Sequence, residues 1–107
     1  MSVVSAEITS AVRDAHVDGK ELKKGQFMAL SGGKMAASAD TAEEALISFL
    51  DGEDMSMYEI ITLFIGKDVN SERRADVTER LEELYPDCEL TVYEGGQPIY
   101  DYLIALE

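Results

Sequence analysis

Residues 1–39 alternate between short apolar stretches and turn signals. The stretches and turns follow one another along this segment: residues 8–12, Asp18-Gly19, residues 27–30, Gly32-Gly33 and residues 35–37. Glycine frees the backbone for tight turns, and short apolar runs between such turns are typical of antiparallel strands. The pattern therefore predicts a run of short antiparallel strands in this part of the chain.

Residues 41–51 change to the spacing of a helix. Apolar side chains fall on one helical face and polar ones on the other: Ala45, Leu46, Phe49 and Leu50 against Glu43, Glu44 and Ser48. Thr41 and Glu44 have the spacing of a capping box. Gly52 follows where the helix is expected to end. The pattern predicts a helix over residues 41–51.

Residues 59–107 carry the clearest fold signal. A continuous apolar run at 59–65 is typical of a strand that is buried on both faces. Within residues 72–85, an apolar stripe of Val77, Leu81, Leu84 and Tyr85 predicts a second helix, with Asn70 or Ser71 as its cap. Alternating residues 88–94 predict a strand, and residues 99–106 predict a last one. The strand, helix and strand form a βαβ unit, whose two strands are expected to be parallel.

Together these elements predict an α+β fold in one domain, residues 1–107. We expect short antiparallel strands, a helix, then βαβ plus a final strand, with both helices packed on a mixed sheet. A chain of 107 residues, 46% of them hydrophobic, is long enough to bury a sizeable core without disulfides.

The charge balance limits the partners that the chain can take. It has 22 acidic and 9 basic residues, a formal net charge of −13. This charge repels nucleic acids and anionic membrane surfaces. The apolar runs are too short to span a bilayer. Residues 1–6 lack the pattern of a signal peptide, and the single Cys88 cannot form an internal disulfide, so we expect a cytoplasmic protein.

The residues that could carry chemistry are sparse. His16 and Cys88 are each the only residue of their type, and neither has a second metal ligand at a suitable spacing. Gly66-Lys67 precedes a predicted helix, but the other residues of a phosphate-binding loop are missing, so this segment is interpreted as an ordinary turn. We therefore expect no catalytic residue, metal site or cofactor in this chain.

The segment Gly95-Gly96-Gln97-Pro98 is the most specific local pattern. Adjacent glycines permit a positive φ and close approach, and proline fixes the exit from the turn. Three tyrosines flank it, at 93, 100 and 102, and tyrosine is enriched at protein interfaces. From the residues alone, a tight strand connection is favoured over a binding surface. Arg13, followed by Asp14, is either a partner contact or half of a local ion pair.

Several segments occur in the same order in one bacterial family. They are Ala-Val-Arg-Asp at 11–14, Asp18-Gly19 with Leu-Lys-Lys-Gly at 22–25, Ile-Ile-Thr-Leu-Phe-Ile-Gly-Lys-Asp-Val at 60–69, Tyr-Pro-Asp at 85–87, and Gly-Gly-Gln-Pro at 95–98 with Tyr-Leu-Ile at 102–104. On these segments the chain resembles the C-terminal region of the bacterial fatty acid kinase ATP-binding subunit, the YloV-like or dihydroxyacetone-kinase-like family.

This resemblance implies a function. In that family an upstream kinase domain binds ATP and magnesium, and the C-terminal region engages a DegV-type fatty-acid-binding protein, whose bound fatty acid is phosphorylated. The chain would then be a non-catalytic recognition module, because no motif of the nucleotide domain is present. The partner-binding residues expected from the turn and the resemblance are Arg13, Gly95, Gly96, Gln97, Pro98, Tyr100 and Tyr102.

Two positions depart from the family pattern. Asp101 stands where the family usually has proline, and Arg73-Arg74 stand where it has acidic residues. Cations at the start of a helix oppose its dipole unless a neighbouring acid or a partner uses them.

Two other classes of function stay open. One is a small-ligand or enzymatic α/β domain with a pocket near Gly66 and Gly95, since open α/β sheets bind ligands at their strand ends. The other is a purely structural assembly domain.

Overall fold

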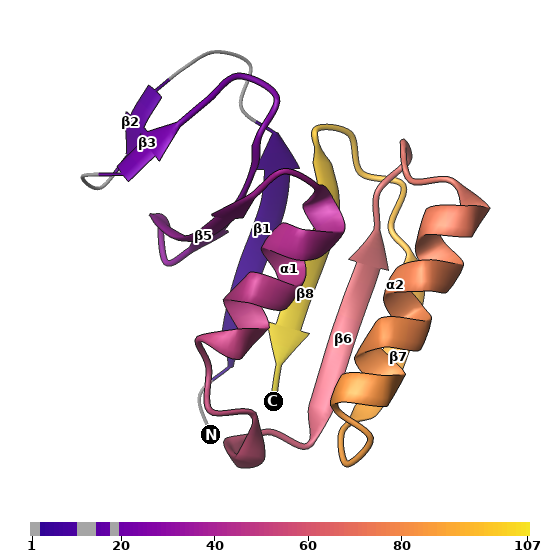
Figure 1. Cartoon of the computed structure of the whole chain (residues 1–107). Helices are drawn as coiled ribbons and strands as arrows, with labels where there is room; N and C mark the ends of the chain where they lie inside the picture. Colours follow the sequence, from indigo (N-terminus) through magenta and orange to yellow (C-terminus); the bar gives the residue numbers. More distant parts are fainter. Residues whose placement is uncertain (1–2, 11–14, 18–19) are drawn as a thin grey trace.

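The computed structural model describes residues 3–10, 15–17 and 20–107 (Figure 1). Its elements follow in chain order: β1 (Val4–Ser10), β2 (Ala15–Val17), β3 (Lys20–Leu22), β4 (Phe27–Ser31), β5 (Lys34–Ala39), α1 (Ala42–Asp51), a 3₁₀ turn (Met55–Met57), β6 (Ile60–Ile65), α2 (Ser71–Leu84), β7 (Glu89–Glu94) and β8 (Tyr100–Leu106).

Six of the strands form one mixed sheet, in the order β5-β4-β1-β8-β6-β7. β6 and β7 are parallel, as the βαβ pattern predicts, and the other neighbouring pairs are antiparallel. β2 and β3 form a separate antiparallel pair. The predicted α+β class and the mixed sheet are confirmed, although the first strand begins at Val4 rather than Ile8.

Local sequence signals set the starts of both helices. The Thr41 hydroxyl accepts a hydrogen bond from the Glu44 backbone N–H at 3.1 Å. The Asn70 side-chain oxygen likewise accepts from the Arg73 N–H at 2.8 Å. Each cap satisfies a backbone donor that the first helical turn leaves without a partner, so both predicted caps are confirmed.

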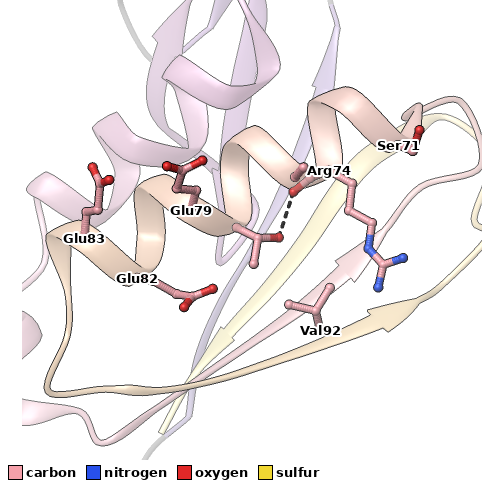
Figure 2. Close-up of a pocket in the computed structure, with 8 residues that line it drawn as sticks. Ser71, Arg74, Glu79, Glu82, Glu83 and Val92 are labelled. Atoms are coloured by element: carbon pink, nitrogen blue, oxygen red, sulfur yellow. Dashed lines mark hydrogen bonds between the residues drawn. The ribbon is translucent and has the colours of Figure 1, made fainter.

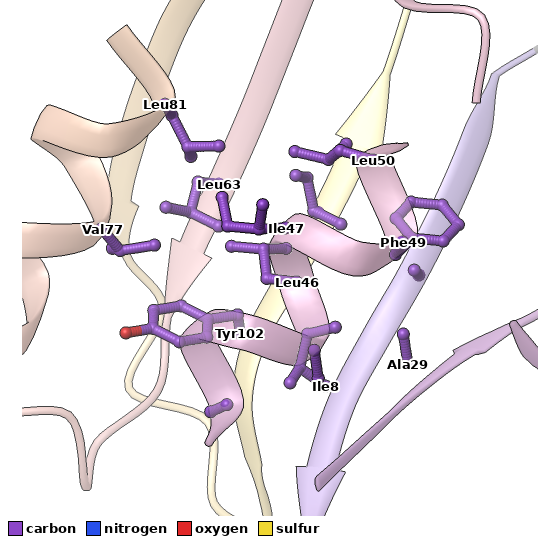
Figure 3. Packing of buried hydrophobic residues seen from close by; sticks show 14 of the residues in the cluster. Ile8, Ala29, Leu46, Ile47, Phe49, Leu50, Leu63, Val77, Leu81 and Tyr102 are labelled. Carbon is purple, nitrogen blue, oxygen red and sulfur yellow. The ribbon is translucent and has the colours of Figure 1, made fainter. Parts of the chain in front are cut away.

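Both helices cover the same face of the sheet (Figures 1 and 3). Buried side chains from α1 and α2 meet those of the central strands in one cluster, which includes Leu46, Leu50, Leu63, Val77, Leu81, Tyr102 and Ile104. A smaller cluster of Leu22 and Met35, with Met28 and Leu30 against it, is separate from this main core. The fold therefore has one well-covered face and one partly open face.

This one-sided arrangement corrects two predictions. In β6 only alternate residues, Ile61, Leu63 and Ile65, are buried, so the strand is not buried on both faces. Its other face has no helix over it because α1 and α2 share one side. In α2, Leu84 is 50% exposed and does not continue the buried stripe of Val77 and Leu81.

A register shift between β1 and β8 positions the region of interest. Ile8 pairs with Tyr102, but the next residue, Thr9, pairs with Tyr100. Asp101 is thus left without a partner on β1, as the extra residue of a β-bulge is. Bulges redirect side chains, and Asp101 reaches across to helix α2.

Candidate functional site

The segment from Gly95 to Tyr100, here called the 95–100 turn, connects β7 to β8 beside the end of β6. The backbone N–H groups of Gly95 and Gly96 both donate to the carbonyl of Ile65, at 3.0 and 2.9 Å. The turn is therefore attached to the last residue of the neighbouring strand and does not extend freely from the sheet.

Gln97 fixes the turn from within. Its side-chain Nε2 donates to the carbonyl oxygens of Phe64 at 3.2 Å and Tyr100 at 3.3 Å. Its own carbonyl accepts from the Lys67 N–H at 3.1 Å. A Cβ on Gly95 would overlap the Gln97 side-chain oxygen, so glycine is needed there for the amide to fold back. The polar atoms of Gln97 are thus used inside the protein.

Ile99 has the most unusual backbone in this region. Its φ is 74°, and among the described residues other than glycine it alone has a positive φ. The Tyr100 N–H donates to the Pro98 carbonyl at 2.8 Å, which makes Ile99 the apex of a three-residue γ-turn of the rare, strained kind. A β-branched residue in such a conformation costs on the order of 1–3 kcal/mol.

The strained turn is held from the sheet, and its side chain points outward. The Thr9 hydroxyl, from a buried residue of β1, donates to the Ile99 carbonyl at 3.1 Å. The Ile99 side chain is 73% exposed, so burial of its own apolar surface does not offset the strain. Neither residue stands out in the sequence, because isoleucine after proline gives no sign of a positive φ.

An aromatic pair borders the turn. The rings of Phe64 and Tyr93 are stacked, with centroids 5.4 Å apart and planes 21° from parallel. Tyr93 is about half exposed, and the Phe64 carbonyl accepts the hydrogen bond from the Gln97 amide. The end of the sheet therefore offers aromatic as well as aliphatic surface.

The structure separates the predicted partner-binding residues. Gly95, Gly96 and Pro98 are exposed, and Gln97 and Tyr100 are half-buried. Tyr102 is fully buried, with none of its surface exposed, so it is corrected from a surface residue to a core residue. Alternate residues of β8 face the helices, and Tyr102 lies on that side. Arg13 lies outside the described residues.

Tyr102 instead joins a polar network beneath the starts of both helices. Its hydroxyl donates to Glu43 Oε2 at 2.5 Å. Arg73 Nη2 donates to the same oxygen at 2.9 Å and to Asp101 Oδ2 at 2.8 Å. Burial, reinforced by the hydrogen bond to the Glu43 carboxylate, raises the pKa of Tyr102. The network ties α1, α2 and β8 together.

Arg73 carries its charge securely in this network. Partial burial by itself disfavours the charged guanidinium, but the hydrogen bonds to Asp101 and Glu43 outweigh it and raise the pKa of Arg73. The neighbouring Arg74 forms an ion pair with Glu94 at the end of β7. Both cations at the start of α2 thus have acidic neighbours, which is the condition under which they can oppose the helix dipole at small cost.

The space predicted for a small ligand is filled by the protein itself. Gly66 is buried, and a Cβ there would overlap the backbone of Tyr100 and Asp101. Beside Gly95, the corresponding space holds the Gln97 amide. The pocket expected near Gly66 and Gly95 is therefore not supported by this geometry.

A groove of about 620 Å³ lies elsewhere, between α2 and the edge strand β7 (Figure 2). Arg74, Glu82 and Val92 point into it, whereas Glu79 and Glu83 point away from the strand. Thr78 in its wall donates its hydroxyl to the Arg74 carbonyl at 2.7 Å. No three His, Cys, Asp or Glu side chains gather as a metal site in the part of the chain that the structure describes. None of the helices described is long and apolar enough to cross a membrane.

Comparison with known proteins decides the family. The FakA-like C-terminal family, which is the C-terminal region of proteins like the A-type component of fatty acid kinase, matches residues 1–107. The chain belongs to this family. The resemblance found in the sequence is thereby confirmed, and it places this FakA-like domain in the context of a multi-component fatty acid kinase.

Individual relatives agree with this assignment. The FakA-like domain is 41% identical over 106 residues to an uncharacterized protein of Staphylococcus haemolyticus, and 35% identical over 108 residues to protein YloV of Bacillus subtilis. It is 39% identical over 109 residues to an uncharacterized protein of Staphylococcus aureus strain USA300. These matches cover 98–99% of this chain, and the chain spans about one fifth (19%) of the length of these relatives.

Proposed function

We propose that this chain is a non-catalytic recognition module of a fatty-acid-kinase-like protein. It engages a DegV-type fatty-acid-binding protein, whose bound fatty acid is phosphorylated by an ATP- and magnesium-binding domain elsewhere in the parent protein. In this proposal the chain itself holds no cofactor, and it works in the cytoplasm. Membership of a fatty acid kinase family supports the kinase context.

The observation that carries the proposal is the Ile99 side chain, exposed at the apex of the 95–100 turn. Gln97 and Thr9 hold the backbone of the turn, so little conformational entropy is lost when a partner binds there. Exposed apolar groups on a rigid frame are typical of the few residues that dominate protein interfaces.

The enzymatic alternative has less support. The protein's own backbone and the Gln97 amide occupy the space beside Gly66 and Gly95 where a substrate was expected. The assembly alternative needs no partner other than copies of the chain, and a binding experiment with the fatty-acid-binding protein distinguishes it.

The proposal is tested by calorimetric titration of the chain with the fatty-acid-loaded DegV-type protein of the same organism. We expect saturable one-to-one binding, and no binding of Mg-ATP by the chain alone. In a second assay, excess chain added to the complete kinase should inhibit acyl phosphate formation, because it competes for the fatty-acid-binding protein.

Each class of function gives a different result. Saturable heat with Mg-ATP would favour the enzymatic alternative. Self-association without binding of the fatty-acid-binding protein would favour the assembly alternative. Absence of both binding and inhibition would refute the recognition proposal.

A further inference from the structure

The 95–100 turn uses a strained residue to present one apolar side chain. The γ-turn at Ile99 is closed by the Pro98 carbonyl and the Tyr100 N–H, and φ at its apex is 74°. Glycine or asparagine is the usual residue in this conformation, since both tolerate a positive φ better than a β-branched side chain does. Isoleucine at this position disfavours the fold without any compensating burial of its own side chain.

The surrounding structure determines this conformation from two sides. Thr9 donates to the Ile99 carbonyl, and Gln97 donates to the carbonyl of Tyr100, the next residue. Backbone strain that is fixed in this way tends to occur where function requires it. Here it directs a side chain away from the sheet, at a point where the chain could have ended the turn with a polar residue.

From these contacts we infer that Ile99 is the anchor of the partner interface and inserts into an apolar pocket of the partner protein, with Thr9 and Gln97 as positioning residues. This inference rests on the proposed function and adds the chemistry of recognition to it. The partner is expected to offer a socket that fits a branched aliphatic side chain. The Phe64–Tyr93 ring pair, which borders the turn, is expected to contact the rim of that socket.

The chemistry of the turn favours an apolar contact over an electrostatic one. Residues 95–100 contain no charged side chain, although the chain as a whole has a net charge of −13. At the end of β7, Glu94 is paired with Arg74. The affinity should therefore depend weakly on salt, because no charged side chain of the turn takes part.

A matched pair of variants isolates the anchor. Met57 is 74% exposed, almost the same as Ile99 at 73%, but it lies in the 3₁₀ turn that precedes β6. Ile99→Ala should weaken binding of the fatty-acid-loaded DegV-type protein about tenfold or more, as expected for a central anchor. Met57→Ala should leave the affinity unchanged within about twofold, and Ile99→Val should retain most of it.

Ile99→Gly distinguishes an anchor from a structural residue. Glycine adopts a φ of 74° without strain, so this variant should melt at the same or a higher temperature while it loses affinity. Thr9→Val, which removes the hydroxyl that holds the turn, should weaken binding less than Ile99→Ala does.

The outcomes separate this inference from the proposed function. If the unmodified chain does not bind the fatty-acid-binding protein, both fail. If it binds and Ile99→Ala and Ile99→Gly bind equally well, or if Met57→Ala loses as much affinity, the anchor is wrong and the proposed function stands. Binding of the chain to phosphatidylcholine vesicles that is lost in Ile99→Ala would also overturn the inference, since the socket would then be a lipid surface.

Discussion

Arg73 Nη2 lies 2.8 Å from Asp101 Oδ2, and these are two of the positions at which the chain departs from its family's usual pattern. An arginine at the start of α2 opposes the helix dipole, and an aspartate replaces proline in β8. Each departure supplies the partner of the other, with Glu43 of α1 completing the group. The two substitutions are thus best understood as one change that cross-links α2 to β8.

A double-mutant cycle measures this link. Arg73→Ala and Asp101→Ala should each lower the free energy of unfolding, and the double variant should lose less than the sum of the two. We expect a coupling energy of about 0.5–2 kcal/mol, because the pair is partly shielded from water. Urea denaturation of the four proteins gives the value, and strict additivity would mean that the two residues do not interact in solution.

The Tyr102 hydroxyl gives a pH-dependent prediction. Its pKa in the folded protein is raised above the ordinary value of 10.0, so the folded state retains a proton that the unfolded state releases. Stability is therefore unaffected below about pH 10 and falls as the pH rises beyond it. Thermal melts between about pH 8 and 11 should record this loss, and Tyr102→Phe should reduce it. Tyr85, whose pKa is also raised by burial and by nearby Asp51, should contribute the remainder.

Tyr102→Phe has a cost of its own at neutral pH. It removes the hydrogen bond to Glu43, whose carboxylate keeps Arg73 as a partner. A loss of about 1–2 kcal/mol in the free energy of unfolding is expected for a buried hydrogen bond to a charged group. A variant as stable as the unmodified chain would show that the bond is not formed.

Helix α2 allows buried and exposed leucines to be compared in one element. Leu81 is buried against the sheet, whereas Leu84 is 50% exposed. Leu81→Ala should cost about 2–5 kcal/mol, and Leu84→Ala well under half as much. Both should unfold in a single transition if the chain is one domain, as its length predicts. Equal losses at the two positions would contradict the orientation of α2.

Two glycines form a second matched pair. A methyl group on Gly66 would overlap the backbone of β8, while one on Gly52 would make only ordinary contacts at 3.5 Å or more. Gly66→Ala should therefore destabilise the protein by more than about 2 kcal/mol, since overpacking against backbone forces a shift. Gly52→Ala, at a position whose φ is −83°, should change stability by less than about 1 kcal/mol. Chemical denaturation gives both values, and similar effects would mean that the β6–β8 contact is looser than described.

Features that depend on neighbouring residues could be predicted from the sequence. Thr41 and Asn70 cap their helices because an N-cap acts over only three residues. The short spacing of the βαβ unit correctly predicts that β6 and β7 are parallel, and the alternation in 88–94 correctly predicts a strand there.

Features that depend on distant residues could not. The apolar run of β6 does not reveal that both helices lie on one side, so the exposure of its second face has no signal in the sequence. The burial of Tyr102 is equally hidden, because the β-bulge at Asp101 belongs to the pairing of β8 with β1 and has no signature in the segment itself. The positive φ of Ile99 likewise depends on Thr9, which is 90 residues away in sequence.

Binding of the partner at the 95–100 turn can be measured directly. The measurement is the change in backbone amide NMR signals of the chain when the fatty-acid-loaded DegV-type protein is added. We expect the largest changes on residues 95–100 and on Thr9, with little effect on the acidic segment at 51–54. Changes confined to the groove between α2 and β7, or to residues 51–54, would contradict a partner interface at this turn.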